Sequence, residues 1–93
     1  MKIIEIYPIA GSFAEDKDKA KNIRLELITP ILEGGEDLVL DFENVESLTQ
    51  SFCHALLSEL IRNYGVNVLD RISFKNCSDE TKSIIEIVID YMQ

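Results

Sequence analysis

Short apolar runs that end at proline or at charged residues predict the strands of this chain. Residues 2–7 are rich in isoleucine and stop at Pro8, which has no backbone donor for a sheet ladder. Residues 37–42 form an apolar run bounded by charged residues, a pattern typical of a strand buried on both faces of a parallel sheet. Residues 71–75 predict a last strand, and residues 11–13 predict a turn or a short second strand. The run at 37–42 is therefore expected to be the central strand.

Apolar residues at helical spacing predict helices before and after the central strand. The first helix covers residues 16–32, and Pro30 is expected to bend or tighten its last turn before Gly34-Gly35 ends it. Its buried face would consist of Ala20, Ile23, Leu27 and Ile31. The last helix begins at Ser78 as its N-cap and continues to the C-terminus. Its buried stripe would consist of Ile84, Ile85, Val88, Ile89 and Met92, with Asp79, Ser83, Glu86 and Asp90 facing water.

The middle helix, which ends at Tyr64, carries two faces of different character. Its broad apolar face predicts core packing and consists of Phe52, Cys53, Leu56, Leu57, Leu60 and Tyr64. The opposite face consists of Ser51, His54, Ser58 and Arg62. Ser47 and Gln50 match a capping box, in which the hydroxyl accepts from the third-residue amide and the glutamine reaches back to the cap. If these two residues form the cap, Thr49 and Ser51 are free for a partner or for phosphorylation.

The alternation of strands and helices predicts the fold class. Short connections between alternating elements favour right-handed crossovers and a mostly parallel sheet. No repeat, linker or low-complexity segment divides residues 1–93. We therefore expect a single domain of the α/β class, a small sandwich in which a mostly parallel or mixed sheet of about four strands is covered by three helices.

Composition and charge restrict the class of partner. The chain has 93 residues, of which 46% are apolar, and this suffices for one core without disulfides or metals. Its net charge of −8 argues against nucleic acid, because affinity for nucleic acid comes mainly from Lys and Arg. A basic or neutral protein fits better, although an acidic surface also simply keeps a small domain soluble.

No apolar run has the length of a membrane span or a signal peptide, so we expect a cytoplasmic protein that does not bind membranes.

Candidate catalytic thiols and metal ligands are few. Cys53 and Cys77 are too far apart in sequence for a zinc motif or a disulfide framework. His54, the only histidine, points away from its neighbour Cys53 because adjacent helical residues face different directions. The acidic residues near the central strand have no spacing that gathers ligands at one point; they are Asp37, Asp41, Glu43 and Glu46. Gly34-Gly35 ends a helix, whereas a phosphate-binding loop opens one. We expect no enzyme activity, no cofactor and no metal.

Residues 38–52 combine an apolar strand ending in Asp41-Phe42, Val45 three residues later, and the segment Thr49-Gln50-Ser51-Phe52 that opens the next helix. In these features the chain resembles a STAS-like domain of unknown function that occurs in bacteria. The chain is more distantly similar to the anti-sigma factor antagonists that define the STAS fold. That similarity implies docking against serine kinases of the histidine-kinase-like ATPase class. It also aligns Gln50 with the position that accepts a phosphate in many STAS domains, and glutamine cannot be phosphorylated.

The resemblance implies a non-enzymatic regulatory module that binds a protein partner, and it implies a STAS-like sandwich for the fold. Open α/β sheets usually present binding residues at the carboxyl ends of their strands, where the central strand leads into the middle helix. We therefore expect the docking surface to consist of Glu46, Thr49, Ser51, His54, Ser58 and Arg62. The alternative is a structural or assembly module that self-associates, as a homodimer for example, and regulates nothing.

Overall fold

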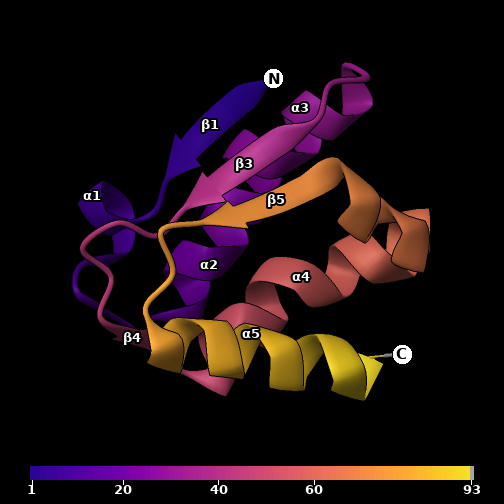
Figure 1. Cartoon of the computed structure of the whole chain (residues 1–93). Coiled ribbons are helices and arrows are strands. Elements are labelled where there is room, and N and C mark those ends of the chain that lie inside the picture. The colour runs from indigo at the N-terminus through magenta and orange to yellow at the C-terminus, as the bar shows by residue number, and fades with distance from the viewer. Residues whose placement is uncertain (93) are drawn as a thin grey trace.

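Parallel strands form two small sheets in the computed structural model, which describes residues 1–92 (Figure 1). The main sheet has the order β1 (Lys2–Glu5), β3 (Leu38–Asp41) and β5 (Ile72–Lys75), and all three strands are parallel. The second sheet pairs β2 (Phe13–Ala14) with β4 (Ser47–Leu48), also in parallel. The predicted α/β class, the parallel pairing and the central position of residues 38–41 are therefore confirmed, with the strands divided into sheets of three and two.

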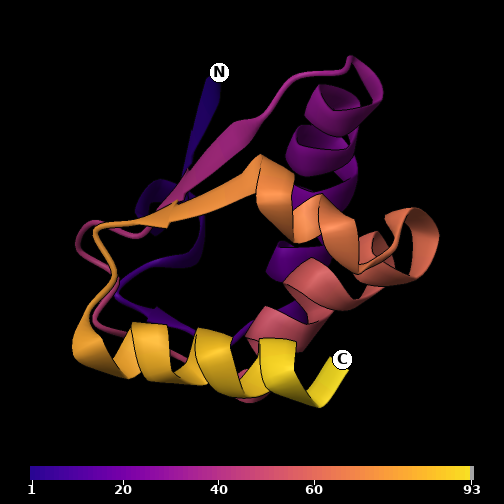
Figure 2. The same cartoon turned by 45° about the vertical axis from the view of Figure 1, so that its right-hand side comes forward.

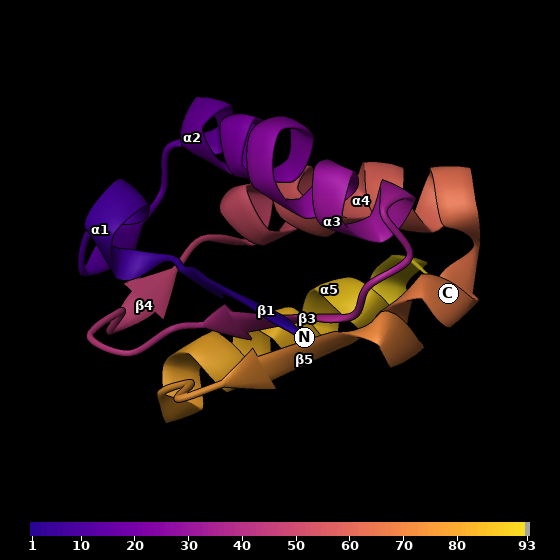
Figure 3. The same ribbon diagram turned by 90° about the horizontal axis from the view of Figure 1, so that it is seen from above.

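The helices pack mainly on one face of the main sheet. One layer contains α2 (Lys17–Ile23), α3 (Thr29–Glu33) and α4 (Gln50–Tyr64). Helix α5 (Asp79–Met92) runs along the margin of the molecule beside α4 (Figure 2). Seen from above, α2, α3 and α4 all lie on the same side of the sheet (Figure 3). The short elements that periodicity did not predict include the single turn α1 (Tyr7–Ala10) and the 3₁₀ helix η2 (Val66–Arg71).

The two faces of the main sheet differ in burial. Side chains that point toward the helices are almost fully buried, among them Ile4, Leu38, Leu40 and Ile72. On the opposite face Ile3 is 62% exposed, and Val39 is buried at 8% exposure but lies outside the main core cluster. The central strand is therefore buried on both faces as predicted, although within residues 1–92 helices cover only one face of the sheet.

A widened turn interrupts the helical segment that follows Asp16. Asp16 caps α2 by accepting from the amide of Asp18 at 2.9 Å. Residues 24–28 form the π-helical turn η1 (Arg24–Ile28), in which the amide of Thr29 donates to the carbonyl of Arg24. Pro30 has no amide hydrogen, and its ring would collide with the carbonyl four residues earlier in a regular α-helix. The helix therefore widens one turn before the proline, which the sequence did not predict, and its last turn tightens before Gly34-Gly35 as predicted, since the amide of Gly35 donates to the carbonyl of Leu32 at 3.0 Å.

The widened turn shifts the buried face of this helix by one residue. Ala20 and Ile23, before the turn, are buried as predicted. After it the buried residues are Ile28 and Leu32, whereas Leu27 is 38% exposed and Ile31 is only half-buried. The assignment of Leu27 to the core is therefore wrong, because the extra residue in the turn rotates it outward, whereas Ile31 still packs against the core but is only partly buried.

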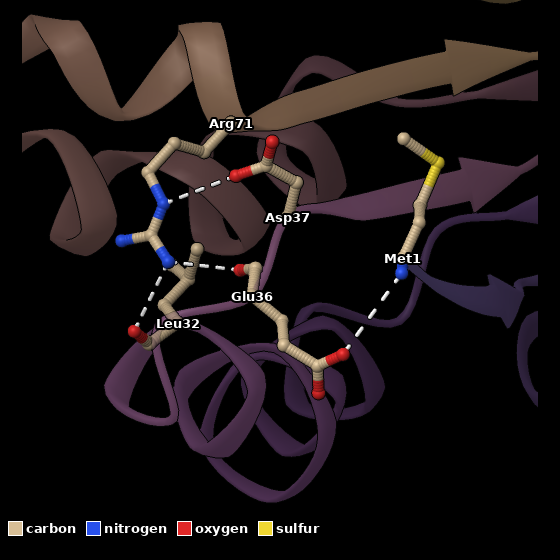
Figure 4. A network of polar contacts seen from close by, with 5 residues as sticks. All are labelled: Met1, Leu32, Glu36, Asp37 and Arg71. Carbon is tan, nitrogen blue, oxygen red and sulfur yellow. Dashed lines mark hydrogen bonds and ion pairs between the residues drawn. The ribbon is translucent and has the colours of Figure 1, made fainter.

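Arg71 joins the starting ends of the strands to the end of α3 (Figure 4). Its Nη2 donates to the backbone carbonyls of Glu36 at 2.8 Å and Leu32 at 3.2 Å, and its Nε lies 3.4 Å from a carboxylate oxygen of Asp37. The amino group of Met1 lies 3.9 Å from the carboxylate of Glu36. One arginine thus donates to the carbonyl of Glu36, beyond the end of α3, and adds a second donor to the carbonyl of Leu32, which also accepts from the amide of Gly35.

Candidate functional site

Helix α4 begins two residues later than its sequence motif predicted. Thr49 has extended backbone angles, and its hydroxyl oxygen accepts from the amide of Phe52 at 3.1 Å, so Thr49 is the N-cap. Ser47 lies in strand β4, where its amide donates to the carbonyl of Ser12, and Gln50 is the first helical residue. The Ser47–Gln50 capping box is therefore wrong, because strand pairing holds Ser47 outside the helix. The expectation that the Thr49 hydroxyl is not needed for the cap is also wrong, because this hydroxyl is the one that caps α4.

The two predicted faces of α4 are present. Phe52, Cys53, Leu56, Leu57 and Leu60 are buried to 1% exposure or less. Of the outward stripe, Ser51, His54 and Arg62 are exposed and Ser58 is half-buried. Tyr64 is the exception on the apolar face, since it is 36% exposed and its hydroxyl donates to the carboxylate of Glu33. That hydrogen bond raises the pKa of Tyr64.

A groove of about 440 Å³ separates the first turns of α4 from the second half of α5; we call it the α4–α5 groove. From α4 it contains two residues of the predicted stripe, Ser51 and His54. From α5 it contains Ile87, which is 49% exposed, and Tyr91, which is 84% exposed. Its remaining lining residues are Lys17, Gln50, Ala55 and Val88. The groove therefore combines polar groups of one helix with exposed apolar groups of another.

The other predicted docking residues lie outside the lining of this groove. Glu46 is exposed in the segment that precedes β4, and its carbonyl accepts from the hydroxyl of Ser78 at 2.7 Å. The Ser78 oxygen also accepts from the amide of Thr81, so Ser78 caps α5 as predicted. Arg62 pairs with Glu59 at 2.9 Å near the far end of α4. Such an exposed ion pair contributes little to stability.

The cysteine and acidic groups near the site are held by packing and hydrogen bonds. Burial raises the pKa of Cys53 to about 12, which keeps the thiol protonated at neutral pH. The side-chain amide of Asn76 and the backbone amide of Glu43 both donate to Asp41, and these bonds lower the pKa of its carboxyl.

Within residues 1–92, no cluster of three or more His, Cys, Asp or Glu has a metal-binding arrangement. In the same residues no helix combines the length and the apolar character that crossing a membrane requires.

Comparison with known proteins identifies the family. The family model described as "STAS-like domain of unknown function (DUF4325)" matches residues 19–82. The match extends from α2 into the first turn of α5 and includes the central strand and all of α4, but not Ile87 or Tyr91. No curated protein and no solved structure matches the chain significantly. Because the family model covers most of its length, the chain belongs to the family of STAS-like domains of unknown function.

Proposed function

We propose that this domain is a non-enzymatic regulatory module that binds a protein partner through the α4–α5 groove. The observation that carries the proposal is the exposure of Ile87 and Tyr91 beside the polar side chains of Ser51 and His54. Contiguous exposed apolar groups with polar neighbours are typical of interaction sites. Aromatic residues are enriched in the buried centres of interfaces and often dominate their energetics.

The position of the groove in the fold supports the same function. The carboxyl end of central strand β3 leads through β4 into α4, and the first turns of α4 form one wall of the groove. Binding sites of open α/β sheets usually lie at this end of the strands. The similarity to anti-sigma factor antagonists favours an ATPase of the histidine-kinase-like class as the partner. On this proposal Ser51 and His54 contact the partner, and Glu46 and Arg62 lie at the edge of the interface or beyond it.

The test is a binding measurement with a partner recovered from the native source. The tagged chain is used to capture proteins, which mass spectrometry identifies, and the purified partner is then titrated against variants. Replacing Ser51 with Trp and Tyr91 with Ser should raise the Kd at least about tenfold, which corresponds to about 1.4 kcal/mol. Both changes are neutral, so they alter the shape of the groove and leave its charge unchanged.

A matched control carries the same types of substitution elsewhere. Ser73→Trp lies on the helix-free face of the sheet, and Leu25→Ser removes an apolar side chain that is 51% exposed on the π-helical turn. This control pair should bind the partner like the unmodified chain. Unchanged affinity in the groove variant, or equal weakening in the control, would refute the proposed docking site.

Self-association is the second candidate, and the free edge of β1 favours it. Within residues 1–92 the main sheet ends at β1, and Ile3 on that strand is 62% exposed. Unpaired edge strands can pair with a second chain. Sedimentation equilibrium of the purified chain distinguishes this candidate, since it requires a dimer that Ile3→Lys dissociates.

A further inference from the structure

Helix α5 carries more apolar surface than its contacts within the chain use. With about 100° per residue, its apolar side chains span about 200° of the helix circumference, whereas packing against one core needs a stripe of little more than about 100°. Of these apolar side chains only Ile85 and Val88 are buried. Ile84, Ile89 and Met92 are half-buried and pack against the core, whereas Ile87 and Tyr91 are exposed.

Three of these residues form one ridge along α5, which we call the α5 ridge: Ile84, Ile87 and Tyr91. Their spacing of three and four residues places them in a row on one side of the helix. Ile87 and Tyr91 line the α4–α5 groove, and Ile84 lines a neighbouring hollow of about 350 Å³. From Ile84 to Tyr91 the ridge rises about 10 Å, which equals about two turns of a partner helix. Rows of this spacing are the surfaces that helices use to pack against one another.

Carboxylates lie along the α5 ridge, whereas Lys82, the basic residue of α5, lies on the other side of the helix. Glu80 and Asp79 line the same hollow as Ile84, and Asp90 is exposed next to Tyr91. Lys82 lies in a separate hollow with Phe74 and Cys77. Lys17 also lines the groove, but its chain neighbours are Asp16 and Asp18. With a net charge of −8 for the whole chain, the field around the ridge favours a cationic partner.

We propose that the α4–α5 groove receives a basic amphipathic helix of the partner. The apolar stripe of that helix packs on the α5 ridge, and its Lys or Arg side chains pair with Glu80 and Asp90. A second copy of this chain is a poorer occupant, because it would bring its own acidic residues against the same carboxylates. The inference rests on the proposed function and specifies the chemistry of the partner.

The test uses synthetic peptides and the full chain. The probe is a fluorescent amphipathic peptide of about eighteen Leu and Lys residues, long enough for about five helical turns. One companion peptide has the same composition in an order that removes the stripe, and another has Glu in place of Lys. In fluorescence anisotropy titrations the Leu/Lys peptide should bind at least about tenfold more tightly than either companion, and salt should weaken its binding.

Variants separate docking on the ridge from general attraction between opposite charges. Glu80→Lys with Asp90→Lys, and separately Ile87→Ser with Tyr91→Ser, should each weaken peptide binding at least about tenfold. The control pair, Glu5→Lys with Glu26→Lys, replaces exposed glutamates of β1 and η1. It changes the net charge by the same amount and should weaken binding only slightly. Equal weakening by the two Glu/Asp→Lys pairs, or no preference for the striped Leu/Lys peptide, overturns the proposal.

The remaining outcomes assign failure to one proposal or the other. If the native partner depends on Ser51 and Tyr91 but the Leu/Lys peptide does not bind, the docking function stands and the basic helix is wrong. If the partner binds the groove variant normally, the docking function fails and this inference fails with it. A dimer of the unmodified chain that Ile87→Ser with Tyr91→Ser dissociates would show that a second copy covers the ridge, which also overturns the proposal.

Discussion

Helices α4 and α5 have nearly equal length but use their apolar residues differently. In α4, five apolar side chains are exposed by 1% or less, because this helix packs against α2, α5 and η2. In α5 only Ile85 and Val88 reach comparable burial among the apolar residues, since α5 lies at the margin of the molecule. The apolar pattern of a helix thus reports all the surfaces that it contacts, including those of other proteins. On the docking proposal, the apolar arc of α5 that the core does not cover is the surface available to a partner.

The largest expected effect tests the packing side of this comparison. Phe52→Ala on α4 removes a ring with no exposed surface and should lower the free energy of unfolding by about 3–5 kcal/mol. Ile85→Ala on α5 should cost about 2 kcal/mol, at the low end of the range, because the margin of the molecule can relax around it. Urea denaturation measures both values. Equal losses would mean that α5 is packed as firmly as α4.

A smaller effect tests how α4 begins. Thr49→Ala removes the hydroxyl that accepts from the amide of Phe52 and should cost about 1 kcal/mol. Gln50→Ala should change stability by less than about 0.5 kcal/mol, because Gln50 is exposed in the first turn and caps nothing. Thermal unfolding of the two variants checks the difference. A larger loss from Gln50→Ala than from Thr49→Ala would restore the capping box that the sequence motif suggested.

The smallest effect concerns the outer side of α5. Tyr91→Ser should alter the free energy of unfolding by less than about 0.5 kcal/mol, since the ring is 84% exposed and helix propensities of the two residues are similar. The same substitution contributes to the loss of partner binding proposed above. A destabilisation of several times this size would mean that the tyrosine belongs to the core, and the contrast with α4 would disappear.

Local patterns predicted much of the fold. The central strand, the buried face of α4 and the Ser78 cap of α5 depend on periodicity or on residues within one turn, so the sequence alone identifies them. The start of α4 was misassigned because the pairing of Ser47 with Phe13, more than thirty positions earlier, decides where the strand ends. The shift of the buried face after Ile23 was missed because it follows from a steric requirement of Pro30 that a helical wheel ignores.

The candidate site was predicted in part. Ser51 and His54 were assigned to an exposed face, and the structure places both in the α4–α5 groove. Ile87 and Tyr91 were assigned no role, because a wheel with a wide apolar arc does not show which part of the arc meets the core. A comparison of the arc width with the width that one core requires would have indicated the α5 ridge.

The parallel register of the main sheet has a consequence for biosynthesis. Lys2 pairs with Leu38, and Leu38 pairs with Ile72. Each pairing therefore joins two strands that are separated in the chain by at least one helix. Pairings of this kind close long loops and slow the folding of a chain. On the ribosome, β1 and β3 have emerged well before β5, and until then one edge of the apolar central strand stays open. The pairing of β5 with β3 closes that edge, and Arg71, just before β5, then holds the carbonyls of Leu32 and Glu36.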